Sequence, residues 1–153
     1  MSYIVLAQSF VEKVLISPDT PFIWNFQRGV EEMLRFAKFS SNQRIQYSLE
    51  LMERRIGEME LLLNESQQKF IPMVENTYEL EADKIVVDMN SSDIFSLVMK
   101  SADVKDNVTQ RLQYDIKALE AISTKETPIE TRGYFTNAIK KTSDCIGMIN
   151  SIR

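Results

Sequence analysis

The sequence predicts an all-α protein: an antiparallel helical bundle of about four long helices, with one or two shorter helices at its N-terminus. Its 153 residues include only four glycines and four prolines, too few for many short strands joined by turns. Apolar residues also recur at alternating spacings of four and three along residues 43–63, which is a helical pattern. The length, the 44% hydrophobic content and the lack of a long linker predict a single domain over residues 1–153.

Two helices are expected before the most regular stripe. Apolar positions repeat with a helical period from about residue 3 to Ile16, and a turn with two prolines at residues 17–21 ends this first helix. Thr20 is the expected N-cap of the second helix, with Pro21 at its first position. The apolar positions of the second helix are Ile23, Phe26, Val30, Met33, Leu34 and Ala37. We expect these two helices to lie across one end of the bundle or to extend it.

The third helix, at residues 43–63, carries the most regular apolar stripe of the chain. The stripe consists of Ile45, Leu49, Met52, Ile56, Met59 and Leu63. One such residue per turn lies on a single face, so this face must be buried against other helices or against a second chain. A fourth helix follows, with an apolar stripe that includes Ile71 and Met89; Pro72 lies in its first turn or at a kink, so the sequence leaves its start open by several residues.

Two further helices complete the predicted bundle. Ser92 is expected to cap a long fifth helix whose stripe ends near Ile122, and Thr127 with Pro128 is expected to open the last helix. Because the connections are short, sequential helices should pack antiparallel. Cys145 falls on the apolar stripe of the last helix, so we expect it to be buried and structural rather than reactive.

Composition argues against several classes of function. The net charge of -4, the pI near 5.0 and the absence of a dense basic run argue against nucleic-acid binding. No segment approaches the ~20 apolar residues that span a bilayer, and the start of the chain lacks the pattern of a secretory signal. A membrane would be reached only through a segment absent from this sequence, and a chain that is complete as given would be cytoplasmic.

No catalytic or metal-binding residues are expected. The chain has no histidine, which is the usual base at neutral pH, the commonest metal ligand and a required part of the di-iron pattern in helical bundles. The acidic residues Glu79, Glu81, Asp83 and Asp88 fall at spacings that spread around a helix. Neither a glycine-rich phosphate loop nor a Cys-x-x-Cys motif occurs. The sequence therefore predicts a protein that is not an enzyme and uses no cofactor.

Two segments, taken together, carry a resemblance to a known family. They consist of Pro18-Asp19-Thr20-Pro21-Phe22-Ile23-Trp24 with Arg28, Glu31 and Glu32, and of Leu49-Glu50-Leu51-Met52-Glu53-Arg54-Arg55-Ile56 with Glu58. This set resembles a bacterial family of extracytoplasmic helical domains of unknown function. The match covers roughly residues 16–63, and it departs from the family where Met52 replaces an alanine and where residues 25–27 replace more basic ones. The resemblance implies an exported or membrane-anchored protein but brings no known activity.

Arg55 is the candidate for a structural clamp between two helices. On the heptad, Glu53 and Arg55 flank the apolar seam, so Arg55 could reach Glu31 or Glu32 on the second helix and fix how the helices meet. Arg54 is expected to point outward and to pair with carboxylates of its own helix. A ligand-binding role for Arg55 and a plain solvated face are the alternatives.

Three aromatic residues within five positions, Phe22, Trp24 and Phe26, cannot all share one face of a helix. They either cover the end of the bundle core or form a patch that binds another protein. The leading hypothesis is therefore a non-catalytic interaction module that contacts another protein or itself, within a membrane-anchored or exported protein. One alternative is a small cytosolic ligand-binding protein or enzyme, with Arg28, Arg55 or buried carboxylates in a pocket between helices. Another is a homodimer formed through the stripe of the third helix.

Overall fold

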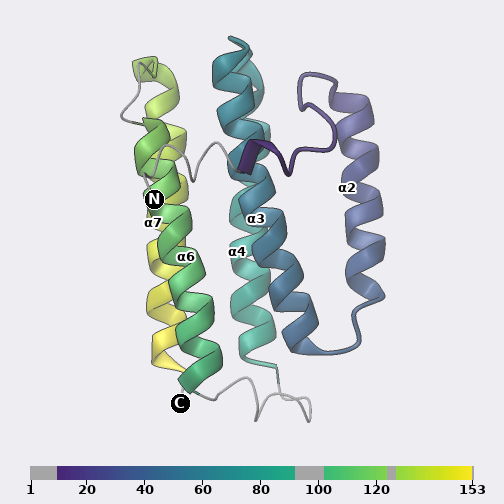
Figure 1. Cartoon of the computed structure of the whole chain (residues 1–153), viewed down its shortest axis with the longest axis vertical. Helices are drawn as coiled ribbons and strands as arrows, with labels where there is room; N and C mark the ends of the chain where they lie inside the picture. The colour runs from purple at the N-terminus through teal and green to yellow at the C-terminus, as the bar shows by residue number, and fades with distance from the viewer. Residues whose placement is uncertain (1–9, 92–101, 124–126, 153) are drawn as a thin grey trace.

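The computed structural model describes residues 10–91, 102–123 and 127–152, and these ranges contain helices but no strand. The elements are α2 (Pro21–Phe36), α3 (Ser41–Asn64), the 3-10 helix η1 (Gln68–Phe70), α4 (Ile71–Met89), α6 (Ala102–Ser123) and α7 (Ile129–Ser151). Four of them, α3, α4, α6 and α7, run side by side as a bundle, and α2 lies beyond α3 on one side of it (Figure 1). The predicted all-α antiparallel bundle is confirmed.

The four long helices close a ring around one core. Helix α3 packs on α4, α4 on α7, α7 on α6, and α6 back on α3. The apolar stripe of α3 lies inside this ring, and Ile45, Leu49, Met52, Ile56 and Met59 are fully buried. Helices of the same chain therefore already cover this stripe.

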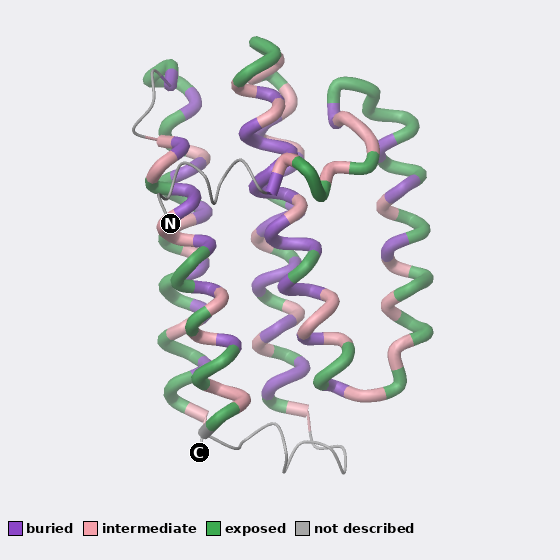
Figure 2. Tube along the Cα trace, viewed as in Figure 1, coloured by how far each residue is buried: buried purple, intermediate pink, exposed green. Residues whose placement is uncertain are grey.

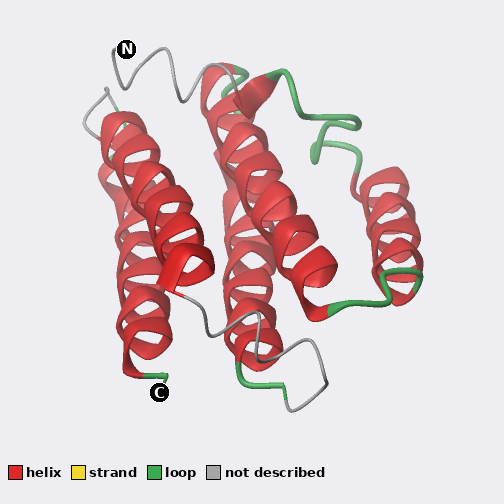
Figure 3. Cartoon of the chain, turned by 60° about the horizontal axis from the view of Figure 1, so that its bottom comes forward, coloured by secondary structure: helices red, strands yellow, loops and turns green. Residues whose placement is uncertain are grey.

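Helix α2 departs from its predicted position. It does not lie across an end of the bundle but runs along its side, as two views agree (Figures 1 and 3). Most residues of α3 are buried, whereas only Trp24, Gln27 and Glu31 of α2 are buried (Figure 2). Two of these three side chains are polar, so α2 turns its polar face toward the bundle.

The helix starts agree only in part with the predicted caps. Ser40 caps α3 through a capping box, accepting a hydrogen bond from the backbone N–H of Gln43 at 3.2 Å. Pro72 lies in the first turn of α4, where its missing N–H has no cost. The predicted cap at Ser92 lies outside the described residues.

The side-chain caps predicted at Thr20 and Thr127 are wrong. Thr20 is the N-cap residue of α2, but its hydroxyl donates to the carbonyl of Ser17 at 2.9 Å. The hydroxyl of Thr127 donates to the carbonyl of Ile122 at 3.0 Å, and α7 begins only after Pro128. In both places the hydroxyl donates to a carbonyl of the preceding turn, and the helix that follows has no side-chain cap hydrogen bond.

Most of the first predicted helix lies outside the described residues, and within its described part only Phe10 and Val11 are helical. This segment crosses α3 at Gly57, where an added Cβ would lie 2.1 Å from the carbonyl oxygen of Phe10. A glycine is required here because any side chain would displace the crossing segment. Phe10 is 5% exposed and belongs to the core.

Cys145 is buried, as the sequence predicted. Its thiol lies 3.6 Å from the carbonyl oxygen of Ala82 on α4. Burial, with a smaller contribution from the charge of Asp83, raises the pKa of the thiol to about 12. The cysteine therefore remains a neutral packing residue at physiological pH.

Candidate functional site

The contact between α2 and the bundle is built around the carboxylate of Glu31. One oxygen accepts from Gln27 Nε2 at 2.9 Å and from Arg54 Nη1 at 2.7 Å, and the other accepts from Arg55 Nη2. Glu31 is only 4% exposed. A buried carboxylate needs such partners, since its charge would otherwise be left without compensation.

Arg55 is the matching cation on α3, and it is fully buried. One of its nitrogens bonds Glu31, and another donates to Glu58 Oε1 at 2.6 Å. Burial raises the pKa of Glu58, and the charge and hydrogen bond of Arg55 oppose that rise. We call Gln27, Glu31, Arg54, Arg55 and Glu58 the Glu31 cluster. Its two arginines and two carboxylates balance in charge.

Trp24 covers the Glu31 cluster from α2. Its ring lies 5.3 Å from the guanidinium carbon of Arg55 and 5.2 Å from that of Arg28, so two cations face the same indole. The indole N–H has no partner of normal hydrogen-bond geometry, although it lies near enough to Glu58 to lower the pKa of that carboxyl slightly. The tryptophan thereby excludes water from the buried ion pairs.

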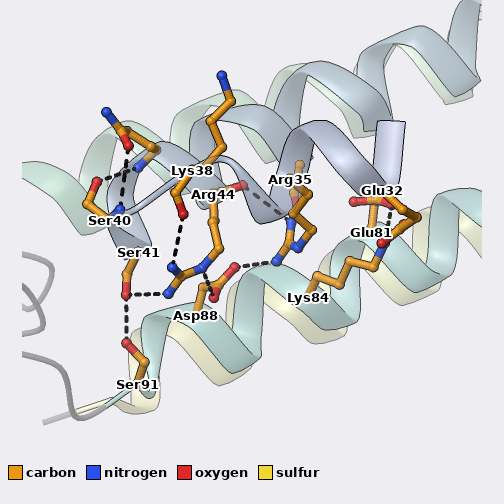
Figure 4. A network of polar contacts seen from close by, with 12 residues as sticks. Glu32, Arg35, Lys38, Ser40, Ser41, Arg44, Glu81, Lys84, Asp88 and Ser91 are labelled. Atoms are coloured by element: carbon orange, nitrogen blue, oxygen red, sulfur yellow. Dashed lines mark hydrogen bonds and ion pairs between the residues drawn. The ribbon is translucent and has the colours of Figure 1, made fainter. Parts of the chain in front are cut away.

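A second polar group holds the C-terminal half of α2 (Figure 4). Asp88 on α4 accepts from Arg35 of α2 and, at 2.9 Å, from Nε of Arg44 on α3. Arg35 also donates to the hydroxyl of Ser48 on α3. We call Arg35, Arg44, Ser48 and Asp88 the Asp88 cluster. It joins three helices through one carboxylate.

Lys84 on α4 adds a third attachment point. It pairs with Glu32 on α2 and, at 2.7 Å, with Glu81 on its own helix. Glu32 is partly exposed, so this pair contributes less than the buried ones. All three attachment points use the charged face of α2.

The opposite face of α2 is apolar and open to solvent. The α2 apolar face consists of Phe22, Ile23, Phe26, Val30, Met33, Leu34 and Phe36, with Phe39 in the turn that follows. Exposed fractions range from 40% for Val30 to 90% for Phe39. The side chains that bind the bundle lie on one side of the helix, so the apolar residues are left on the other.

The structure brings only part of the predicted site together. One place holds four of the predicted residues, Trp24, Arg28, Glu31 and Arg55. The predicted partners of Arg55 were Glu31 and Glu32, and Arg55 pairs with Glu31. Glu32 pairs with Lys84 instead.

Two further sequence-based expectations are corrected. Phe22 and Phe26 do not cover the bundle core but are 87% and 71% exposed. Arg54 does not point outward but pairs with Glu31 across the helix contact. Charge balance explains this last difference, since the buried carboxylate of Glu31 recruits both arginines.

Glu53 lies on another side of α3 and takes no part in the α2 contact. Its carboxylate accepts from Arg111 on α6 at 2.7 Å and pairs with Lys13 of the N-terminal segment. Nearby Asp115 on α6 is 1% exposed, and both of its carboxyl oxygens lack a hydrogen-bond partner. Burial, and then the charge of Glu53, raise its pKa well above the usual value. The folded protein therefore holds the proton of Asp115 up to a higher pH than the unfolded chain does.

Several of these residues were missed by sequence reasoning. Asp88, Arg35 and Lys84 are ordinary charged residues in their helices, and only the fold brings them together. Asp115 carried a signal, because it falls three residues after Leu112 and four before Leu119, at a position of the buried stripe of α6. Phe36 and Phe39 extend the aromatic pattern that begins at Phe22 and could have been included.

A shallow depression lies beside the Asp88 cluster. It measures about 320 Å³ and is lined by Glu32, Arg35, Phe36, Lys38 and Arg44. Its two arginines are bound to Asp88, and the fully buried Arg55 is out of its reach. Within the described ranges, no three histidine, cysteine or acidic residues are grouped for a metal ion, and no helix is long and apolar enough to cross a membrane.

Comparisons with models of known families, with curated proteins and with solved structures found no match.

Proposed function

We propose that this chain is a non-catalytic helical module that binds a protein partner, either a different protein or a second copy of itself, through the α2 apolar face. The supporting observation is the orientation of α2, which buries charged residues against the bundle and leaves eight large apolar residues in solvent. Contiguous apolar patches of this size are rare on monomers and mark interaction surfaces. Its aromatic residues are of the type that contributes most to binding at protein interfaces.

The attachment of α2 supports binding without refolding. The Glu31 cluster fixes the middle of the helix, and the Asp88 cluster fixes its C-terminal half. A helix held in place before binding loses little conformational entropy when a partner arrives. The apolar face is thus presented as a rigid surface.

The location of the module is a separate proposal, which rests on the family resemblance. We propose that the module belongs to an exported or membrane-anchored protein and works outside the cytoplasm. Protease treatment of intact cells should then cleave the native protein. Full protection in a soluble cytosolic fraction would contradict this location.

Site-specific cross-linking tests the binding surface. A photoreactive amino acid would replace Met33, which is 72% exposed on α2, and in a matched variant Met148, which is 40% exposed on α7. After illumination of the cells that produce the protein, we expect a defined adduct from position 33, absent from position 148. Loss of the adduct when Phe26→Asp is added would assign it to the α2 apolar face. Equal labelling at both positions, or none at position 33, would contradict the proposal.

A further inference from the structure

The α2 apolar face is large enough for a stable protein interface. Its four phenylalanines are 71–90% exposed, and at about 200 Å² for a phenylalanine they present roughly 650 Å² of surface. With Ile23, Val30, Met33 and Leu34 the face exceeds the ~800 Å² that each partner contributes to an interface of standard size. Two copies joined by this face would therefore bury a standard interface.

The α2 apolar face carries no charged side chain, and this limits the kind of partner that can bind it. The acidic residues of α2 and Arg35 are held by ion pairs with the bundle, and Arg28 lies over Trp24. A lipid surface is favoured by free Lys and Arg beside the apolar face, and the net charge of -4 disfavours an anionic bilayer. A second copy presents the same uncharged surface, so the pairing desolvates no charge on it.

Two phenylalanines of the α2 apolar face are placed symmetrically about Gly29. Phe22 and Phe36 lie seven residues before and seven residues after Gly29, about 10 Å away on either side. Gly29 is exposed, and a Cβ built there would meet no atom within 4 Å. A two-fold axis through Gly29 would let two antiparallel helices approach closely at the glycine. Phe22 of one copy would then lie opposite Phe36 of the other, with Phe26 and Met33 filling the space between.

We infer that the protein forms a symmetric dimer in which α2 pairs antiparallel with α2 of a second copy, crossing near Gly29. This inference rests on the proposed function and names the partner of the same surface. Close contact of the two helices would place their Gly29 Cα atoms within the range that a disulfide bridges, given helix axes 8–10 Å apart. The two Phe36 positions would lie roughly 20 Å apart and could not be bridged.

Sedimentation equilibrium of the full chain tests the association. We expect a monomer–dimer equilibrium that becomes tighter with added salt, because the contact is apolar and both copies carry a net negative charge. Phe26→Asp should weaken the dimer by at least about tenfold. Val87→Asp, at an exposed apolar position on α4, is the matched control and should leave it unchanged. A monomer at all accessible concentrations, or equal effects of the two variants, would overturn the inference.

Disulfide cross-linking in a Cys145→Ala background tests the geometry. Gly29→Cys should give a covalent dimer under mild oxidation, whereas Phe36→Cys alone should give none. Mixing the Phe22→Cys and Phe36→Cys proteins should give a mixed dimer. Efficient self-linking of Phe36→Cys would show a parallel pair and overturn the inference, as would equal linking at every position.

The outcomes separate this inference from the proposed function. A monomeric chain whose Met33 cross-links to a different protein would overturn the dimer and leave the module's binding role standing. A monomeric chain that floats with zwitterionic lipid vesicles, and loses flotation with Phe26→Asp, would overturn both. A dimer that meets the two cross-linking expectations supports both.

Discussion

Arg55 of α3 and Glu31 of α2 form an ion pair in which the guanidinium is fully buried and the carboxylate nearly so. A charge at this depth requires a partner from the neighbouring helix, because leaving it unpaired costs several kcal/mol. The partner lies on the polar face of α2, so the polar face must turn inward. The exposed apolar face of α2 therefore follows from this buried ion pair, together with the contacts that Asp88 and Lys84 make to α2.

Removing the carboxylate of Glu31 should detach α2. In Glu31→Gln, Arg55 keeps only Glu58 as a charged partner, and Arg54 loses its own. We expect a loss of about 3 kcal/mol in the free energy of unfolding, measured by urea denaturation. The control is Glu32→Gln, whose partly exposed pair with Lys84 is worth about 0–1 kcal/mol. Equal losses in the two variants would contradict the role given to Glu31.

Asp115 should make the fold less stable as the pH rises. Burial raises the pKa of its carboxyl in the folded state above the usual 3.8, so the folded protein holds a proton that the unfolded chain releases. The resulting stability is complete below pH 3.8 and is lost as the pH rises toward the folded-state pKa. Asp115→Asn should remove this dependence, so the variant should gain stability relative to the natural protein as the pH rises.

The matched control for Asp115 is Asp106→Asn, at an exposed position on the same helix. Urea denaturation at pH 5 and pH 7 would be compared for the three proteins. A pH dependence that persists unchanged in Asp115→Asn would show that this carboxyl is not the titrating group.

Glu75 on α4 should titrate near neutral pH. Burial raises its pKa to about 7, and the hydrogen bond that the protonated carboxyl donates to Glu79 and the charge of Glu79 add to the rise. Since the folded-state value lies above the usual 4.5, stability falls as the pH rises from about 4.5 through 7. Glu79→Gln should lower the pKa of Glu75, which carboxyl resonances in an NMR titration would report. Glu65→Gln, at an exposed position, should leave the Glu75 titration in place.

Gly57→Ala should displace the N-terminal segment from α3. The new methyl group would lie 2.1 Å from the carbonyl oxygen of Phe10, which is backbone and cannot rotate away. Limited proteolysis before Ile16 should become faster, with loss of the packing of Phe10. Gly133→Ala, where a Cβ meets no atom within 4 Å, should instead stabilise α7 by roughly 0.5–1 kcal/mol. Identical behaviour of the two variants would show that the segment does not cross at Gly57.

Much of the bundle could be predicted because its helices follow simple periodicity. The stripe from Ile45 to Met59 is fully buried, Pro72 begins α4, and Cys145 lies in the core. In these helices the apolar face is also the face that packs. Arg55 could be placed beside the seam for the same reason, and its pairing with Glu31 follows from that register.

The orientation of α2 could not be predicted from its own pattern. Its apolar stripe defines two faces, and ordinary burial would turn Phe26 and Met33 inward. The opposite orientation depends on Arg55, Asp88 and Lys84, which lie on two other helices. Thr20 is the N-cap residue of α2 as predicted, but its hydroxyl, like that of Thr127, donates to a carbonyl of the preceding turn.

Fluorescence of the single tryptophan tests the orientation of α2 most directly. Trp24 is fully buried against the Glu31 cluster, on the face of α2 opposite Phe26. For dilute protein the account predicts a blue-shifted emission that acrylamide quenches weakly. A matched variant that moves the probe, Trp24→Phe with Phe26→Trp, should emit like an exposed indole and quench readily. The reverse result, with Trp24 freely quenched and position 26 protected, would mean that the apolar face of α2 packs on the bundle and would contradict the account.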